Sequence, residues 1–145
     1  MVVLGLSQVA AGGGRQPRLP GLKVLVVEDE QDSRELLAEF LELEGAEVRT
    51  AADAARGMEA LGSFRPAVLV SDIGMPGEDG HSFVRRLRSL PRDAGSTTPA
   101  IALTAYVQPE DRAKSLAAGF DEHLGKPVDF DKLVKRIAQL CGAHR

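Results

Sequence analysis

Apolar runs and amphipathic stretches alternate five times along the chain after its first twenty residues. Residues 22–27, 67–71 and 100–104 are nearly continuous apolar runs rich in Val, Leu and Ile. Runs of this length are typical of strands buried on both faces, as in a parallel sheet. Weaker runs at residues 46–51 and 122–125 predict two further strands.

Between these runs, apolar residues recur with a period near 3.6, which predicts helices with one buried face. From the first helix to the fifth, the expected buried residues are Leu36, Leu37, Phe40 and Leu41; Ala54, Ala55, Met58 and Leu61; Phe83, Val84, Leu87 and Leu90; Ala113, Leu116, Ala117 and Phe120; and Phe130, Leu133, Val134, Ile137 and Leu140. Asp53 and Asp129 are placed to cap helix starts, and Gly45, Gly62 and Gly119 to end helices. The alternation predicts an α/β fold, a doubly wound (βα)5 unit with right-handed crossovers.

Polar side chains follow the predicted strands at the points where the strands end. Glu28 and Asp29 come after the first strand, Asp72 after the third, Thr104 at the end of the fourth and Lys126 after the fifth. The carboxyl ends of parallel strands share one edge of a sheet, which is where open α/β sheets bind ligands. Three acids, a hydroxyl and a lysine at this edge predict a site for a metal cation and a phosphoryl group.

Composition narrows the function classes. The chain has 145 residues, enough for one domain, and its formal net charge of −3 does not favour nucleic acid. The single cysteine, Cys141, has no partner within the chain, which indicates a reducing, cytoplasmic setting. No apolar run approaches the ~20 residues of a membrane span, so we expect no membrane contact. We expect a flexible linker or the cut end of an upstream domain at residues 1–20, the folded domain at 21–142 and a tail at 143–145.

The strings "LVVEDE" at 25–30, "LVSDIGMPGEDG" at 69–80, "ALTA" at 102–105 and "GKP" at 125–127 together resemble one family. They are similar to the receiver domain of two-component response regulators, and the resemblance covers residues 22 to about 141. It implies a flavodoxin-like, CheY-like fold whose five-stranded parallel sheet has the order 2-1-3-4-5. It further implies a phosphorelay signalling domain, from a hybrid sensor histidine kinase or a single-domain response regulator, rather than an enzyme acting on an external substrate.

The resemblance implies that Asp72 accepts a phosphoryl group from a histidine kinase or a histidine phosphotransfer domain. A carboxylate is ionised at neutral pH and needs no general base, so the obstacle is repulsion between two anions. Mg²⁺ (or Mn²⁺) would relieve that repulsion. The implied ligands are Asp29, Asp72 and the backbone carbonyl of Gly74, with Glu28 acting through a water.

The same resemblance implies a cradle for the phosphoryl oxygens. Thr104 would donate its hydroxyl, Lys126 would supply a point charge, and the backbone N–H groups of Gly74 and Ala105 would complete the set. Pro127 is expected to follow a cis peptide bond.

His123 occupies the position of the family's switch aromatic residue. We expect Thr104 and His123 to carry the signal to a downstream partner protein, through the face formed by the fourth helix, fifth strand and fifth helix. Gly74 and Tyr106 hold positions that tune dephosphorylation, where bulky Tyr106 would shield the acyl phosphate. His81 is expected to be a surface residue of the third helix.

Other functions remain open from the sequence. A haloacid-dehalogenase-like phosphatase also uses Asp, Mg²⁺, Thr and Lys, but its nucleophile normally follows the first strand. Flavin binding would need a hydroxyl- and glycine-rich loop where this chain has an acidic one. An unphosphorylated pseudo-receiver acting only as a docking module is disfavoured because all five key residues are present.

Overall fold

A single parallel sheet organises the part of the chain that the computed structural model describes, residues 16–142. Its strand order is β2-β1-β3-β4-β5, as the family resemblance predicted. The strands are β1 (Lys23–Val27), β2 (Glu47–Ala51), β3 (Val68–Asp72), β4 (Ala100–Thr104) and β5 (Glu122–Gly125).

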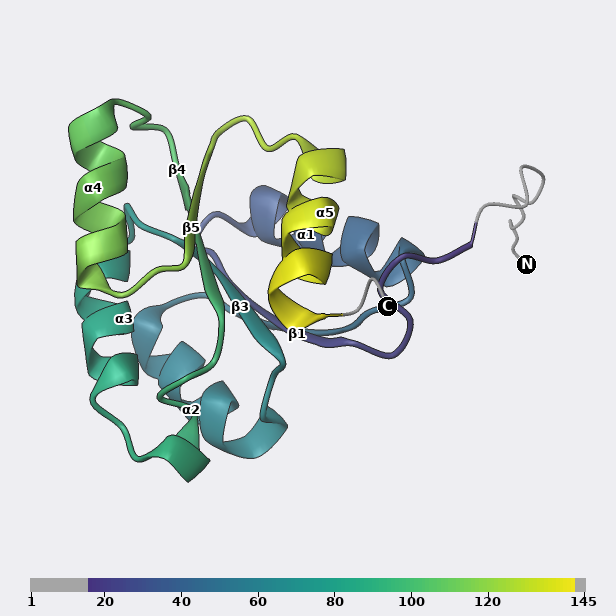
Figure 1. The fold of residues 1–145 in the computed structure, drawn as a ribbon, viewed down its shortest axis with the longest axis horizontal. Helices are drawn as coiled ribbons and strands as arrows, with labels where there is room; N and C mark the ends of the chain where they lie inside the picture. Colours follow the sequence, from purple (N-terminus) through teal and green to yellow (C-terminus); the bar gives the residue numbers. More distant parts are fainter. Residues whose placement is uncertain (1–15, 143–145) are drawn as a thin grey trace.

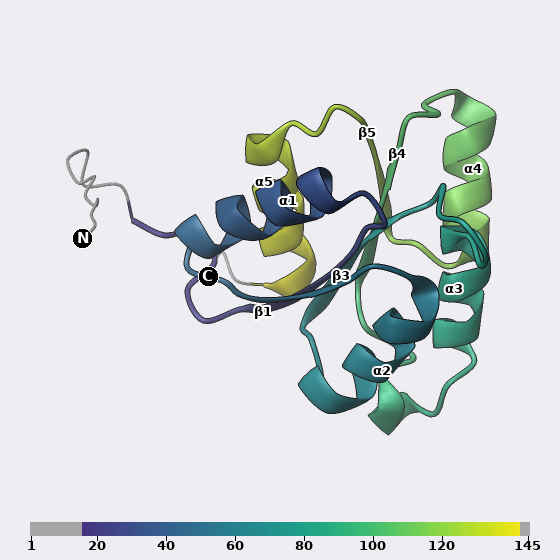
Figure 2. The same ribbon diagram turned by 180° about the vertical axis from the view of Figure 1, so that it is seen from behind.

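Five helices cover the two faces of the sheet. They are α1 (Gln31–Leu43), α2 (Ala54–Phe64), α3 (Gly80–Arg88), α4 (Pro109–Ala118) and α5 (Phe130–Cys141), with a short 3-10 turn, η1 (Arg92–Ala94). Helices α2, α3 and α4 lie on one face, and α1 and α5 lie on the other (Figures 1 and 2). The doubly wound α/β prediction is therefore confirmed.

The sheet separates two apolar cores. Every residue of β3 and β4 is buried, which confirms the prediction from their continuous apolar runs. Because side chains alternate between the faces of a strand, Val26 packs with α1 and α5 while Val27 packs with α2 and α3.

The predicted helix ends are confirmed except at Gly62. The carboxylates of Asp53 and Asp129 each accept a backbone N–H in the first turn of the helix that follows. Gly45 and Gly119 have φ angles of 93° and 129°, a region that glycine adopts without strain. Helix α2, however, continues past Gly62 to Phe64, with Arg65 as its C-cap, because the burial of Phe64 outweighs the weak helix propensity of one glycine.

The predicted buried face of α4 is wrong except for Phe120, which follows the helix and is buried. Leu116 is 40% exposed and Ala113 and Ala117 are also exposed, whereas Ser115 and Ala118 are buried. Small residues occupy several faces of this helix, so periodicity alone does not select one, and side-chain hydrogen bonds of Ser115 fix the rotation instead.

Two further residues that were expected to be buried are exposed. Leu36 is 54% exposed although its neighbours Leu37 and Leu41 are buried, and Ala55 lies on the solvent side of α2. Leu37 and Leu41 lie one turn apart and suffice to pack α1 on the sheet, which leaves Leu36 beside a surface recess.

The segment just before β1 packs on the domain, although we expected linker up to residue 20. Leu19 is fully buried in the core beneath α1 and α5, and the Arg18 side chain pairs with Glu44 and Asp131. The linker and tail expectations for residues 1–15 and 143–145 lie outside the described residues. Among residues 16–142, no helix is long and apolar enough to cross a membrane.

Candidate functional site

Three carboxylates meet where β1 and β3 end. Val27 pairs with Ser71 in the parallel register, so Glu28, just after β1, and Asp72, the last residue of β3, lie side by side. One oxygen from each of Glu28, Asp29 and Asp72 can be chosen so that all three lie within 4.8 Å of one another. Glu28 is 1% exposed and Asp72 is 6% exposed, while Asp29 is the most accessible of the three. The predicted acidic cluster is therefore assembled.

Lys126 reaches the same cluster from the end of β5. Its Nζ lies 2.9 Å from Glu28 Oε1 and 3.3 Å from Asp72 Oδ1. The Lys126 backbone N–H donates to the carbonyl of Thr104 at 2.8 Å, which continues the β4–β5 pairing to the site. The peptide bond between Lys126 and Pro127 is cis, as predicted.

The electrostatics of the site favour an added cation. Burial raises the pKa of Glu28, and the attraction of Lys126 does not fully offset it. Desolvation opposes the charge of Lys126, but the carboxylates of Glu28 and Asp72 outweigh it and raise the pKa of Lys126. Lys126 pairs with two of the three clustered carboxylates, Glu28 and Asp72, so a divalent cation with oxygen ligands would relieve the remaining repulsion.

The residues predicted to bind the phosphoryl oxygens lie around the same strand ends. The Gly74 N–H donates to Asp72 Oδ1 at 3.3 Å. Thr104 is 2% exposed, and its hydroxyl oxygen accepts the Tyr106 N–H at 3.0 Å. Ala105 is exposed, and Tyr106 is 69% exposed.

Arg34 is a supporting residue that the sequence did not reveal. Its guanidinium donates to the carbonyls of Glu28 and Asp29, at 2.9 and 3.2 Å, and so holds the acidic turn against α1. A basic residue in the first turn of a helix opposes the helix dipole. That unfavourable placement is the signal in the sequence that could have identified it.

Gly80 brings the start of α3 against the loop after Asp72. Its N–H donates to the carbonyl of Ile73 at 2.8 Å. A Cβ atom at this position would lie 2.6 Å from the Asp72 carbonyl oxygen and 2.7 Å from the Ile73 Cα. Only glycine therefore permits this approach without moving the backbone of the loop.

His123 is 7% exposed and points into the seam between α4 and β5. Its Nε2 lies 3.1 Å from the Tyr106 carbonyl, and its Nδ1 lies 3.0 Å from Ser115 Oγ. His81 is not the free surface residue that we expected, because it is partly buried and its Nε2 lies 3.1 Å from the same Ser115 hydroxyl.

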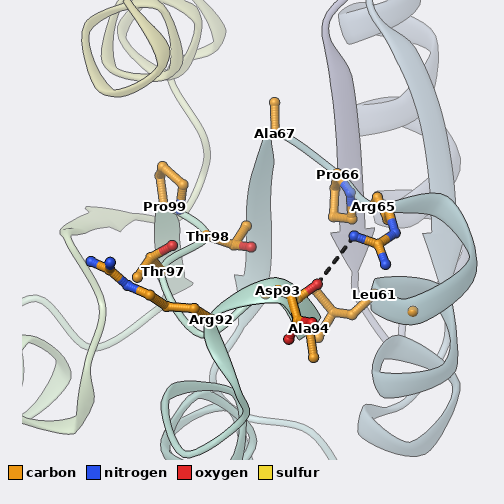
Figure 3. Close-up of a pocket in the computed structure, with 12 residues that line it drawn as sticks. Leu61, Arg65, Pro66, Ala67, Arg92, Asp93, Ala94, Thr97, Thr98 and Pro99 are labelled. Carbon is orange, nitrogen blue, oxygen red and sulfur yellow. Dashed lines mark hydrogen bonds between the residues drawn. The ribbon is translucent and has the colours of Figure 1, made fainter.

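A separate recess of about 310 Å³ lies at the amino-terminal ends of the strands, on the opposite side of the sheet from the acidic site. Figure 3 shows Arg65 donating across it to the Asp93 carbonyl, a contact of 3.1 Å. Its lining includes Ala67 and Pro99, which immediately precede β3 and β4. The recess is thus one strand length away from Asp72 and forms no part of the acidic site.

Comparison with known proteins indicates one family. Residues 24–138 match the family model of the response regulator receiver domain. The chain is 45% identical over 123 residues to an uncharacterized 14.6 kDa protein from the sodA1 3′ region of Leptolyngbya boryana, covering 85% of this chain and 92% of that one. It is 39% identical over 118 residues to the transcriptional regulatory protein PrrA of Mycobacterium tuberculosis, covering 81% of this chain and 49% of PrrA.

Solved structures agree with this assignment. The receiver domain of the sensor histidine kinase PA1611 from Pseudomonas aeruginosa, solved with magnesium in its active-site cleft, has a TM-score of 0.76 and 29% identity, covering 84% of this chain and 98% of that one. Chemotaxis protein CheY4 of Vibrio cholerae has a TM-score of 0.76 and 31% identity, and the match covers 83% of this chain and 98% of CheY4.

The chain therefore belongs to the response regulator receiver domains of two-component signalling. Receivers of this kind are signalling modules that interact with histidine kinases or phosphotransfer proteins, and they are not enzymes that turn over an external substrate. A hybrid histidine kinase of Dictyostelium discoideum is among the relatives, at 35% identity over 8% of its length. The chain spans about half the length of PrrA, so the rest of that regulator has no counterpart in the matched region.

Proposed function

We propose that this domain is a magnesium-dependent phosphoacceptor whose Asp72 receives a phosphoryl group from a phosphohistidine. The observation that supports it most directly is the placement of Asp72. Its buried carboxylate lies beside the ammonium group of Lys126 and within reach of two further acids. Family membership disfavours the phosphatase and flavin alternatives, because it accounts for an acceptor after the third strand and an acidic turn after the first.

The residues at the site fit Mg²⁺ or Mn²⁺. Asp29, Asp72 and the carbonyl of Gly74 would be direct ligands, with Glu28 one water away because Lys126 already occupies one of its oxygens. Bound there, the cation would neutralise charge between the incoming phosphoryl oxygens and the carboxylates.

Phosphoryl transfer then depends on how the Asp72 carboxylate and the phosphorus atom are positioned, and it needs no general base to deprotonate the nucleophile. An Asp72 oxygen forms a bond to phosphorus while the phosphorus–nitrogen bond of the donor breaks, and the imidazole leaves with the bonding electron pair. Lys126 would turn from Asp72 toward a phosphoryl oxygen, and the N–H groups of Gly74 and Ala105 would bind the others. The Thr104 hydroxyl would leave the Tyr106 N–H and donate to the phosphoryl group, while Tyr106 shields it from water.

The donor protein needs a surface beside this site, and an apolar recess of about 480 Å³ provides one between α1 and the loop after β5. It runs from Glu28 and Lys126 to an apolar wall that includes exposed Leu36. We propose that the kinase or phosphotransfer domain packs here, which would bring its phosphohistidine to Asp72. The exposure of Leu36 is then explained by its contact with the donor protein.

We predict that Leu36→Asp will slow phosphorylation by a phosphohistidine protein at least tenfold, because a charge replaces an apolar contact. Phosphorylation by acetyl phosphate, which has no protein surface, will stay within about twofold of the wild type. Leu43→Asp is the matched control, since Leu43 is 82% exposed on α1 and does not line the recess. Equal slowing with both donors would place the defect in the chemistry and refute the docking role.

The proposed function is tested by incubating the protein with acetyl phosphate and Mg²⁺ and measuring its intact mass. We expect the mass of one added phosphoryl group in the wild type, and none in Asp72→Asn or in excess EDTA. A wild type that stays unmodified under these conditions, and that also fails to bind beryllofluoride, would instead support an unphosphorylated docking module.

A further inference from the structure

The acidic turn between β1 and α1 is tied to its surroundings by several hydrogen bonds. The Glu28 N–H donates to the Ala51 carbonyl at 3.0 Å, which joins the start of the turn to β2. One oxygen of the Glu28 carboxylate accepts from Lys126 Nζ at 2.9 Å, and the other accepts the Glu30 N–H at 3.1 Å. Both oxygens of Glu28 are therefore engaged within the protein.

Asp29 differs from its neighbours in this turn because its carboxylate has no partner among residues 16–142. It is nevertheless placed so that one of its oxygens joins oxygens of Glu28 and Asp72 in the acidic cluster. With no side-chain hydrogen bond or ion pair to hold it, the direction of this carboxylate depends on the backbone angles of Asp29.

Arg34 restrains those backbone angles. Its Nη1 atom lies 2.9 Å from the Glu28 carbonyl oxygen and 3.2 Å from the Asp29 carbonyl oxygen. This nitrogen carries two hydrogens, so it donates to both carbonyls at once. The two carbonyls belong to the two separate peptide planes that flank the Asp29 Cα. Holding both planes restrains the φ and ψ angles of Asp29, and with them the direction of its side chain.

The peptide plane before Asp29 depends most on Arg34. The plane after Asp29 has a second restraint, because its N–H is the one of Glu30 that donates to the Glu28 carboxylate. For the plane before Asp29, the bond from Arg34 to the Glu28 carbonyl is the hydrogen bond found among residues 16–142. Loss of Arg34 would therefore free one side of Asp29.

Electrostatics alone does not favour an arginine at this position. Its positive charge lies beside a site that we expect to bind a cation, and within residues 16–142 it makes no ion pair with a carboxylate. It also lies in the first turn of α1, where the helix dipole favours acids. The two bonds to the acidic turn are the favourable contribution that offsets these costs.

The rigidity of a ligand affects Mg²⁺ and Ca²⁺ differently, although both ions carry the same charge. Mg²⁺ requires near-ideal octahedral geometry with oxygens at about 2.1 Å, whereas Ca²⁺ takes oxygens at about 2.4 Å in flexible arrangements. A carboxylate with a fixed direction can meet the stricter demand of Mg²⁺. A loosened carboxylate loses that advantage but still suits Ca²⁺.

We propose that Arg34 is a positioning residue that sets the preference of the acidic site for Mg²⁺ over Ca²⁺, by holding the backbone on both sides of Asp29. This inference rests on the proposed function, in which Asp29 and Asp72 are ligands of the cation. Arg34 itself does not touch the cation and acts through the two carbonyls.

Arg34→Lys is the decisive variant because it keeps the positive charge. The lysine ammonium group lies one bond closer to the backbone and lacks the planar fork of arginine, so we expect it to lose at least one carbonyl. Mg²⁺ affinity should fall about tenfold, as is typical when a residue that orients a metal ligand is lost. Ca²⁺ affinity should stay within about twofold of the wild type.

The experiment is calorimetric titration of the metal-free protein with Mg²⁺ alone and with Ca²⁺ alone, on variants that circular dichroism shows to be folded. Arg34→Ala is the second variant. Loss of its charge acts equally on both divalent ions, so the ratio of the two affinities still reports geometry and should also fall. Arg56→Lys is the matched control, because Arg56 is an exposed arginine in the first turn of α2, and its ratio should match that of the wild type.

The outcomes separate this inference from the proposed function. Equal changes for both ions in Arg34→Lys, or no change for either, overturn the inference, and Mg²⁺ binding by the wild type then leaves the proposed function standing. A wild type that binds Ca²⁺ more tightly than Mg²⁺, or an equal fall of the ratio in Arg56→Lys, also overturns the inference. A wild type that binds neither ion and stays unmodified by acetyl phosphate refutes both.

Discussion

Lys126→Met will separate metal binding from phosphoryl transfer. We expect the variant to bind Mg²⁺ about tenfold more tightly, while its rate of phosphorylation by acetyl phosphate falls at least a hundredfold. In the absence of metal, its free energy of unfolding should fall by about 2 kcal/mol.

These effects follow from the double role of one ammonium group. In the metal-free site, Lys126 is the cation within ion-pair distance of both Glu28 and Asp72. Its removal leaves a 1% exposed glutamate without its counter-ion, which costs stability. The same removal deletes a positive charge that repels Mg²⁺, which strengthens binding of the metal. No other described lysine or arginine forms an ion pair with Asp72, so we expect no other side-chain cation to replace Lys126 in transfer, and the rate should fall.

The measurements are Mg²⁺ titration by calorimetry, urea unfolding with and without Mg²⁺, and single-turnover phosphorylation. Lys135→Met is the matched control. Lys135 makes an exposed ion pair on α5, and its substitution removes the same net charge from the protein. Weaker Mg²⁺ binding in Lys126→Met would contradict the account, and so would an equal gain in the control.

Gly80→Ala will lower the free energy of unfolding by about 3 kcal/mol and slow phosphorylation at least tenfold. The added Cβ would lie 2.6 Å from the carbonyl oxygen of Asp72 and 2.7 Å from the Ile73 Cα. Both are backbone atoms, so neither can give way by changing a rotamer. Helix α3 must instead move away from the loop, and the carboxylate of Asp72 moves with that loop.

Gly62→Ala provides the opposite result for the same chemical change. Gly62 lies within α2, and a Cβ there would meet nothing within 4 Å. We expect the free energy of unfolding of this variant to rise by about 0.5–1 kcal/mol, because alanine is the better helix former. Urea unfolding and acetyl phosphate kinetics measure both variants. A Gly80→Ala protein as stable and as reactive as the wild type would show that the loop adapts without cost.

The fold could be predicted because strong local signals agreed with one another. Continuous apolar runs marked β1, β3 and β4, and their burial on both faces follows from helices on either side. The carboxylates and Lys126 could be placed at one edge because the chain direction of parallel strands decides where their ends lie. The order of the strands, by contrast, was predicted from the family resemblance and not from these local signals.

The predictions failed where a tertiary contact, and not the local sequence pattern, decides which side chains are buried or which residues support the site. Ser115 turns its side of α4 inward because His81 on α3 and His123 on β5 lie within hydrogen-bond distance of its hydroxyl, and a hydrophobicity pattern does not record such bonds. Arg34 was missed because its sequence signal, a basic residue in the first turn of a helix, does not identify its partners, which are backbone carbonyls. Leu36 fits the periodic pattern of α1 but lies at the rim of a recess that only the assembled fold creates.

The placement of the Leu36 recess has a kinetic consequence. The recess belongs to the side of α1 and α5 (Figures 1 and 2). The recess also includes Phe130 at the start of α5, so a donor seated on it would cover part of the face of α4, β5 and α5 that we expect the downstream protein to use. The donor and the downstream protein would then bind in turn, and the delay before a signal is passed on would include the time that the donor takes to leave.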